Sequence, residues 1–308
     1  MNQDIQAGSP TLSVIMPVLN AARTLRVAID SVLQQSFVNF ELVVLDGLST
    51  DGTLGILKSV DDARLRWSSG RDGGVYEAMN KGIAEAKGEW LYFMGADDSL
   101  FAKDVFEKMF AVATTGNSRL IYGDIYSNKF RIRYDGRFDT NKLRFRNICH
   151  QSILYHRTLF QRLGSFDPRF RVCADWAFNI RCFQDATANP RYVDLVVANF
   201  EGGLSQQQSD LPFLRSFLFP ANMKWLNENG LATLRSIRVY DGWWRLIRSL
   251  RLRGNDNLEQ LADGVQVPAV IQRMNSLQQR ISPGMLWRGS ISKTLMTLSY
   301  LTNFSSLR

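Results

Sequence analysis

The sequence is poor in cysteine and has no long apolar run, and both absences narrow the class of protein. No stretch of about 18 uncharged apolar residues occurs, so we expect no membrane-spanning helix. The start, MNQDIQAGSPTLSVIMP, does not place a basic segment before a long apolar run, so we expect no secretory signal and a cytoplasmic location. The three cysteines, Cys149, Cys173 and Cys182, form no CxxC pair. We interpret them as reduced core residues and not as a redox or zinc site.

A glycine-rich loop is also missing after the first apolar run, where Pro17-Val18-Leu19-Asn20 stands instead. A dinucleotide-binding dehydrogenase would carry GxGxxG at this place, because its backbone must approach a pyrophosphate closely. An enzyme that makes sugar nucleotides would carry a glycine-rich basic loop there. Neither class fits.

The first 230 residues carry almost no net positive charge. The whole chain has a net charge of +8, yet residues 231–308 hold ten arginines and one lysine against four acidic residues, a net charge of +7. A nucleic-acid-binding protein would not concentrate its charge in one tail, so we expect no nucleic-acid partner. We predict a catalytic domain over residues 1–210 and a basic helical extension over residues 211–308.

Short apolar runs alternate with helical periodicity through the first 100 residues, which predicts an α/β fold with a mostly parallel, Rossmann-like sheet flanked by helices. Pro17 is expected to end the first strand. After residue 126 the pattern becomes antiparallel, with a helix at Asp175–Phe183 and a strand at Tyr192–Phe200. The early strands are predicted at Leu12–Met16, Phe40–Leu45, Arg64–Ser68, Glu89–Met94 and Leu120–Tyr126.

Polar residues follow three of these strands, at Asn20, Asp46 and Asp97-Asp98. Ligands bind beyond the carboxyl ends of strands in such sheets. Paired carboxylates suit a hard divalent cation, and such a cation could neutralise a diphosphate leaving group. Asp97 and Asp98 could equally form a helix N-cap with a solvated neighbour.

Four segments together resemble family-2 glycosyltransferases: SVIMPVLN (13–20), ELVVLDGLSTDGT (41–53), DGGVYEAMNKGI (72–83) and GEWLYFMGADD (88–98). The resemblance continues loosely to GGLS at 202–205 and so covers about the first 205 residues. It implies the GT-A fold and inverting transfer of a sugar from a nucleotide-diphosphate sugar, UDP-sugar first, with Mg²⁺ or Mn²⁺. The acceptor would be a saccharide or lipid-linked molecule in surface-polysaccharide or glycolipid synthesis. The nucleotide-sugar side would span about residues 12–125 and the acceptor side about 126–210.

The resemblance also assigns roles to single residues. Asp46 would accept a hydrogen bond from the base, and Asp97, with its neighbour Asp98, would bind the metal. Two positions depart from the family pattern, because Gly95 stands for the first Asp of the metal motif and Gly47 for a second Asp beside Asp46. The residues assigned to the nucleotide-sugar are Pro17, Asn20, Asp46, Arg71, Asp72, Asp97 and His150.

Asp175 matches the catalytic carboxylate, the base that would take the acceptor's proton, although Ala174 replaces the Glu that usually precedes it. Its alternative role is a helix N-terminal carboxylate stabilised by the macrodipole. His150 is either a structural hydrogen-bond donor or an acceptor or phosphate contact. Tyr76 is interpreted as a core residue, and Lys81 as a solvated one.

The basic extension carries Trp243 and Trp244 among the arginines of residues 235–253. This mixture suits a helix lying on an anionic membrane, which would place the protein at the inner face of the cytoplasmic membrane. A helix docked on the catalytic domain is the alternative. Met285–Leu307 is amphipathic and could be a second interfacial segment or form an oligomer. A different function, a catalytically inactive GT-A-like subunit of a polysaccharide-synthesis complex, is disfavoured because Asp46, Asp97, Asp98 and Asp175 are all present.

Overall fold

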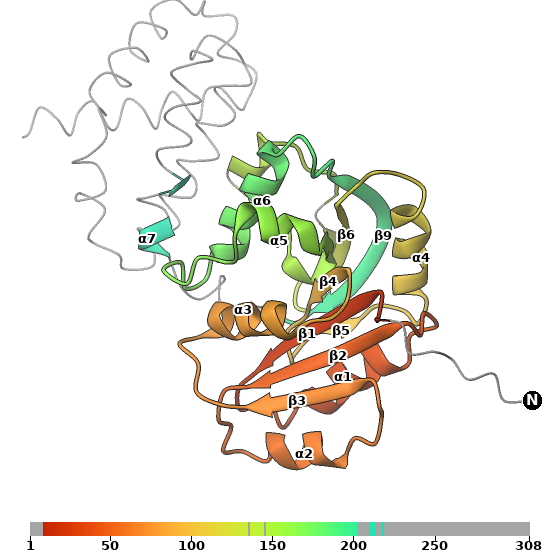
Figure 1. Ribbon diagram of the computed structural model, residues 1–308, viewed down its shortest axis with the longest axis vertical. Helices are drawn as coiled ribbons and strands as arrows, with labels where there is room; N and C mark the ends of the chain where they lie inside the picture. Colours follow the sequence, from red (N-terminus) through yellow and green to blue (C-terminus); the bar gives the residue numbers. More distant parts are fainter. Residues whose placement is uncertain (1–8, 135, 145, 203–209, 214–216, 219–308) are drawn as a thin grey trace, which may run out of the picture. The chain divides into compact units, whose positions relative to one another are not determined.

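The computed structural model describes residues 9–134, 136–144, 146–202, 210–213 and 217–218 (Figure 1). The chain divides into two units, Met1–Phe217 and Leu218–Arg308. Apart from Leu218, the described residues all belong to the first unit. The predicted membrane-binding segment at residues 235–253, the segment Met285–Leu307 and the GLS part of the motif at 202–205 lie outside the described residues.

The N-terminal half forms a parallel sheet in the order β3-β2-β1-β4. Its strands are β1 (Leu12–Val18), β2 (Phe40–Asp46), β3 (Leu65–Ser69) and β4 (Trp90–Phe93), and the helices between them are α1 (Leu25–Leu33), α2 (Thr53–Ser59) and α3 (Val75–Glu85). Residues of β2 are buried along the whole strand. Burial on both faces explains why these strands read as continuous apolar runs and not as alternating ones.

The prediction that Pro17 ends the first strand is wrong. β1 continues to Val18, and Pro17 pairs in register with Leu45 of β2. On its other side β1 pairs with β4 only from Leu12 to Ile15. Pro17 therefore lies past the end of that ladder, where its missing N–H removes no hydrogen bond to β4.

The second half adds the predicted antiparallel part and completes a nine-stranded mixed sheet. β8 (Ile153–His156) is antiparallel to β4, β6 (Leu120–Ser127) is antiparallel to β8, and β9 (Arg191–Phe200) is parallel to β6. Two short strands, β5 (Ser99–Leu100) and β7 (Ile132–Tyr134), pair with β9 and β6. The helices are α4 (Val105–Ala113), α5 (Arg157–Leu163), α6 (Ala174–Gln184) and the short α7 (Leu211–Phe213). The α/β class is as predicted, whereas α4 and α5 were not predicted.

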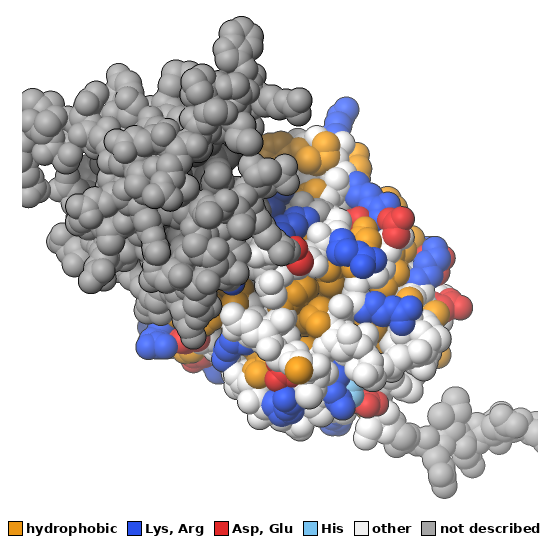
Figure 2. Space-filling model, turned by 90° about the horizontal axis from the view of Figure 1, so that it is seen from above, with side chains coloured by type: hydrophobic (Ala, Val, Ile, Leu, Met, Phe, Trp, Pro, Cys, Tyr) orange, Lys and Arg blue, Asp and Glu red, His pale blue; other side chains and the backbone are white. Residues whose placement is uncertain are grey.

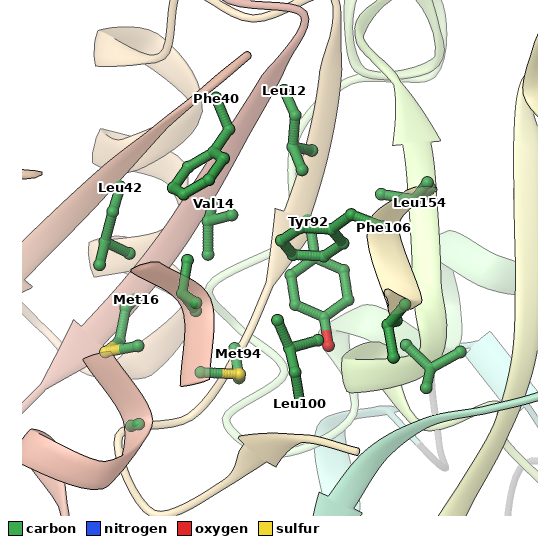
Figure 3. Packing of buried hydrophobic residues seen from close by; sticks show 14 of the residues in the cluster. Leu12, Val14, Met16, Phe40, Leu42, Tyr92, Met94, Leu100, Phe106 and Leu154 are labelled. Atoms are coloured by element: carbon green, nitrogen blue, oxygen red, sulfur yellow. The ribbon is translucent and has the colours of Figure 1, made fainter. Parts of the chain in front are cut away.

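The main core lies between the sheet and the helices α1 and α4, where Leu12, Val14, Leu42, Tyr92 and Phe106 interdigitate (Figure 3). Burying each such side chain contributes roughly 1.5–3 kcal/mol. A second group of aromatic rings packs where α5 and α6 cover the other face. It consists of Phe93, Tyr155, Phe160, Phe166 and Phe178. The two packed faces hold β4 and β8 rigidly at the centre of the sheet.

The surface of the described part mixes charges of both signs with apolar side chains on the face shown in Figure 2. That agrees with the nearly neutral composition of the first 230 residues. The three cysteines lie in the described part of the chain as thiols; Cys182 is buried, whereas Cys149 and Cys173 are only partly buried, so the prediction of core residues holds for Cys182 alone. None of the helices in the described ranges combines the length and apolar character that crossing a bilayer requires.

Candidate functional site

The carboxyl end of β2 presents Asp46, which is 2% exposed. Its Oδ2 accepts a hydrogen bond of 2.5 Å from Ser69 Oγ, and the backbone N–H of Ser49 donates to both carboxylate oxygens at 3.2–3.3 Å. The carboxylate is thus held by β3 and by its own loop. A fixed carboxylate at this edge can present an oxygen to a ligand without reorganisation.

Asn20 ties the loop after β1 to the loop after β2. It adopts a left-handed backbone (φ 51°), which an asparagine tolerates better than most residues. Its Oδ1 accepts a hydrogen bond from Thr50 N at 2.9 Å, and its own N–H donates to Ser49 Oγ at 2.7 Å. Pro17, partly buried, precedes this junction. These contacts give Asn20 a structural role beside its predicted contact with the nucleotide-sugar.

Asp72 approaches the same edge from the loop after β3. A Cβ placed on Gly47 would lie 3.0 Å from Asp72 Oδ2, so a larger residue at position 47 would crowd Asp72. Asp72 Oδ1 accepts a hydrogen bond from Gly74 N at 3.0 Å. Lys81, which was predicted to be solvated, donates a hydrogen bond of 2.7 Å from Nζ to the backbone carbonyl of Arg71 and so ties this loop to α3. The side chain of Arg71 is exposed.

The pair Asp97-Asp98 follows β4, and the structure separates the two carboxylates. Asp97 is exposed, whereas Asp98 is 3% exposed. Asp98 Oδ2 accepts a hydrogen bond of 2.6 Å from Gln151 Nε2, and its Oδ1 accepts one of 3.3 Å from Glu201 N. Burial, and then the charge of Asp97, raise the pKa of Asp98 to about 6. Asp97 is therefore the carboxylate of the two that faces solvent.

Gly95 brings the backbone close to both carboxylates. A Cβ at this position would lie 2.6 Å from Asp97 Oδ1 and 2.9 Å from Asp98 Oδ2. With Gly at position 95, where the resemblance leads one to expect Asp, the Asp97 side chain can fold back over the turn. An aspartate at position 95 would force it to move.

The donor set at this turn fits a divalent cation of the magnesium or manganese type. Such ions use one or two carboxylates together with substrate phosphates. Asp97 offers an exposed carboxylate on a rigid strand end. In the described ranges, no group of three or more His, Cys, Asp or Glu side chains forms a complete metal cage. A cation at Asp97 would thus take its remaining ligands from a bound diphosphate or from water.

Asp175 lies in the first turn of α6, 5% exposed, and several groups hold its carboxylate. Tyr76 donates from its hydroxyl to Oδ1 at 2.6 Å, and Asn147 donates from Nδ2 to Oδ2 at 2.9 Å. Burial, and then the charge of Asp175, raise the pKa of Tyr76 well above its ordinary value, so its hydroxyl stays protonated and remains a donor. Tyr76 is buried as predicted, but it is also a partner of the predicted base.

The 3₁₀ turn η2 (His150–Ser152) connects the two acidic sites. His150 Nδ1 lies 3.5 Å from Asp175 Oδ2, while the neighbouring Gln151 binds Asp98. Sequence reasoning singled out His150 but assigned no role to Gln151 or Asn147. Gln151 directly follows the predicted His150, which was a usable signal, whereas Asn147 belongs to no pattern.

Asp210 anchors the segment that precedes α6. Its Oδ2 accepts hydrogen bonds from the backbone N–H groups of Val172 and Cys173, at 2.9 and 3.1 Å, and its Oδ1 accepts one from Phe213 at 3.2 Å. Asp210 is 4% exposed. Asp175 lies two residues after Cys173, in the first turn of α6. The buried carboxylate of Asp210 therefore helps to fix the start of the helix that carries Asp175.

Comparisons with known proteins agree with the motifs. The sequence model described as glycosyl transferase family 2 matches residues 13–180. The PGL/p-HBAD biosynthesis glycosyltransferase of Mycobacterium bovis is 44% identical over 214 residues, which cover 67% of this chain and 84% of that protein. Two solved structures share the fold at 18% identity. S. aureus TarS 1-349 in complex with UDP has a TM-score of 0.60, and the match covers 87% of this chain and 79% of the TarS chain. Mannosyltransferase PcManGT from Pyrobaculum calidifontis, in complex with GDP-Man and Mn²⁺, has a TM-score of 0.54. The match covers 98% of this chain and 89% of the mannosyltransferase chain.

Proposed function

Since the chain belongs to glycosyl transferase family 2 and has the GT-A fold, we propose that it is an inverting, metal-dependent enzyme that transfers a sugar from a UDP-sugar to a glycolipid or polysaccharide acceptor. The single observation that supports this most strongly is the η2 turn. Its Gln151 donates a hydrogen bond to Asp98, the neighbour of the exposed Asp97, and its His150 lies 3.5 Å from the carboxylate of Asp175.

The donor would bind along the carboxyl edge of β1, β2 and β3. Asp46 has the rigidity needed to accept a hydrogen bond from the base, and the loops of Pro17 and Asn20 would border the nucleoside. Arg71 and Asp72 would close the pocket from the loop before α3. The structural neighbours with UDP, UDP-GlcNAc and GDP-Man support a nucleotide-diphosphate donor.

Mg²⁺ or Mn²⁺ would be held by Asp97, and it supplies charge neutralisation for the diphosphate as this group leaves. Asp98 is buried, whereas its neighbour Asp97 is exposed. We therefore assign Asp98 to support the turn and to add negative charge behind Asp97, and Asp97 to contact the cation. The Mn²⁺ in the mannosyltransferase complex is consistent with this assignment.

Asp175 would act as the general base. The acceptor hydroxyl oxygen forms a bond to the anomeric carbon while the bond from that carbon to the diphosphate oxygen breaks. The diphosphate leaves with the electron pair, and the hydroxyl proton moves to Asp175. His150, partly exposed beside Asp175, would contact the donor sugar or its phosphate. Attack from the face opposite to the diphosphate inverts the anomeric centre.

A lipid-linked acceptor would place the enzyme at a membrane. The relative named for PGL/p-HBAD biosynthesis supports an acceptor of the glycolipid class. We propose that residues 1–210 form the catalytic domain and that the basic extension, residues 211–308, contacts the inner face of the cytoplasmic membrane or a second copy of the chain.

The test is a screen of the purified full chain against UDP-, GDP- and dTDP-sugars with Mn²⁺. We expect a rise in the melting temperature with one class of nucleotide-sugar, UDP-sugars first, together with slow donor hydrolysis or transfer. A chain that binds no nucleotide-sugar and releases no nucleoside diphosphate would be an inactive member of the family.

A further inference from the structure

We propose that Tyr76, Asn147 and Asn179 are positioning residues for Asp175. Tyr76 anchors Oδ1, and Asn147, oriented by Asn179, holds Oδ2 in place to receive the acceptor proton. The inference rests on the proposed role of Asp175 as the base. It goes further because it assigns one oxygen to the chemistry and names the residues that make the assignment.

Oδ1 of Asp175 is fully engaged by the protein. The Tyr76 hydroxyl donates to it at 2.6 Å, and the backbone N–H of Trp176 donates at 2.9 Å. Tyr76 is 6% exposed, and its ring packs against Phe166 with the centroids 5.5 Å apart. Two short donors and a packed ring leave no room for an acceptor hydroxyl at Oδ1.

Oδ2 has one close donor, Asn147 Nδ2 at 2.9 Å. His150 Nδ1 is at 3.5 Å, beyond the usual length of a hydrogen bond, and the His150 side chain is 23% exposed. Since an ionised carboxylate oxygen can accept two hydrogen bonds, Oδ2 retains capacity on the side where His150 meets solvent. An acceptor hydroxyl can therefore donate to Oδ2.

The charge of the Asp175 carboxylate determines which way the side-chain amide of Asn147 points. An ionised carboxylate only accepts, so Asn147 must turn its NH₂ group toward Asp175 and its Oδ1 away. That Oδ1 accepts from Asn179 Nδ2 at 2.9 Å, and Asn179 Oδ1 in turn accepts from the Tyr155 hydroxyl at 2.7 Å. Asn179 is completely buried. The chain Tyr155–Asn179–Asn147 thus fixes the orientation of the Asn147 amide.

Tyr76 also connects the base to the loop predicted to hold the donor. It lies in the first turn of α3, which begins directly after Gly74, and Asp72 accepts a hydrogen bond from Gly74 N. One helix start therefore borders both the nucleotide-sugar and the base. The donor loop therefore leads directly into the helix whose Tyr76 hydroxyl donates to Oδ1 of Asp175.

In the transfer step the acceptor O–H proton passes to Oδ2 as the new carbon–oxygen bond forms and the diphosphate departs with its electron pair. Tyr76 keeps its proton throughout. Removing its hydroxyl leaves Oδ1 with one donor fewer, so the carboxylate loses part of the fixed orientation that points Oδ2 at the acceptor. A misplaced catalytic group then lowers the transfer rate by about tenfold or more.

The experiment compares Tyr76→Phe and Asn179→Leu with Tyr122→Phe in the full chain, using the donor and acceptor on which wild type is active. Tyr122 is also a buried tyrosine, and among the described residues its hydroxyl bonds to the backbone of Phe138 alone, at 2.9 and 3.3 Å. We expect Tyr76→Phe to lower kcat by about tenfold at unchanged donor KM, because orientation of the base is lost and donor binding is not. Asn179→Leu should do the same to a smaller extent. Tyr122→Phe should keep the wild-type kcat.

Donor titration and circular dichroism of each variant give the folded, donor-binding fraction used to normalise kcat. An unchanged kcat in Tyr76→Phe, or a raised donor KM at an unchanged kcat, would overturn the proposal. Asp175→Asn separates the two claims. If Asp175→Asn turns over like wild type, the base itself is misassigned. If Asp175→Asn is inactive while both Tyr76→Phe and Asn179→Leu are normal, only the positioning role fails.

Discussion

The side-chain amide of Gln151 donates a hydrogen bond of 2.6 Å to Oδ2 of Asp98, and this bond ties the η2 turn to the carboxyl end of β4. The preceding residue, His150, faces Asp175 across 3.5 Å. Two carboxylates that are 77 positions apart in the chain (98 and 175) thus lie beside one turn of three residues. The turn thereby links the proposed metal site to the proposed base.

Asp97→Asn should abolish metal-dependent turnover and preserve the fold. The cation contributes several kcal/mol to a charged transition state, so the loss of its exposed ligand should reduce the rate by about 10²-fold or more. Donor turnover is measured against Mn²⁺ concentration, with circular dichroism as the control for folding. Full activity of wild type in excess chelator would contradict the metal assignment.

Asp175→Asn should bind the donor with unchanged affinity, because its side chain is predicted to face the acceptor hydroxyl and not the nucleotide. Its transfer rate should fall by about 10²-fold or more, as is typical when a general base is lost. Isothermal titration with the nucleotide and saturation kinetics measure the two quantities separately. A collapse of donor affinity at an unchanged saturated rate would assign Asp175 to donor binding instead.

Asp98 should make the metal-free protein less stable as the pH rises from about 4 to 7. Its pKa is raised from 3.8 to about 6, so the folded state holds the proton more tightly than the unfolded state. The stabilisation is complete below about pH 4 and is lost as the pH rises through about 6, and it amounts to about 3 kcal/mol at most. The test is urea unfolding in chelator between pH 4.5 and 7.5, on wild type and Asp98→Asn. The difference between the two curves should depend on pH, and parallel curves would remove the claim.

The basic extension should bind anionic vesicles, although its residues lie outside the described ranges. Each arginine near an anionic surface contributes on the order of 1 kcal/mol, and salt screens that contribution. Replacing Arg245, Arg248 and Arg251 with Gln should weaken co-sedimentation with anionic vesicles, as high salt should for wild type. A water-soluble acceptor should still be glycosylated by the variant. Wild-type protein that stays in the supernatant at low salt would favour a docked or dimer-forming helical element.

The early strands and the candidate acidic positions could be predicted from the sequence because their signals are local. A parallel strand buried on both faces needs an uninterrupted apolar run, and a ligand site beyond such a strand needs polar residues directly after it. At Asp46 and again at Asp97-Asp98, the apolar run and the polar residue that follows it lie within a few positions of each other. The helices α4 and α5 escaped prediction, although their residues are contiguous as well.

Other features depend on contacts between distant segments. Asp97 and Asp98 look alike in the sequence, and only Gln151 and the backbone of Glu201 distinguish a buried carboxylate from an exposed one. Helical spacing placed Tyr76 on a buried face, yet the carboxylate that it meets lies 99 residues further along the chain. The sequence by itself determined which residue types were available at the ends of the strands. Tertiary structure decided which carboxylate is exposed and which donors each oxygen of Asp175 meets, because burial and hydrogen-bond partners arise only when separate segments pack together.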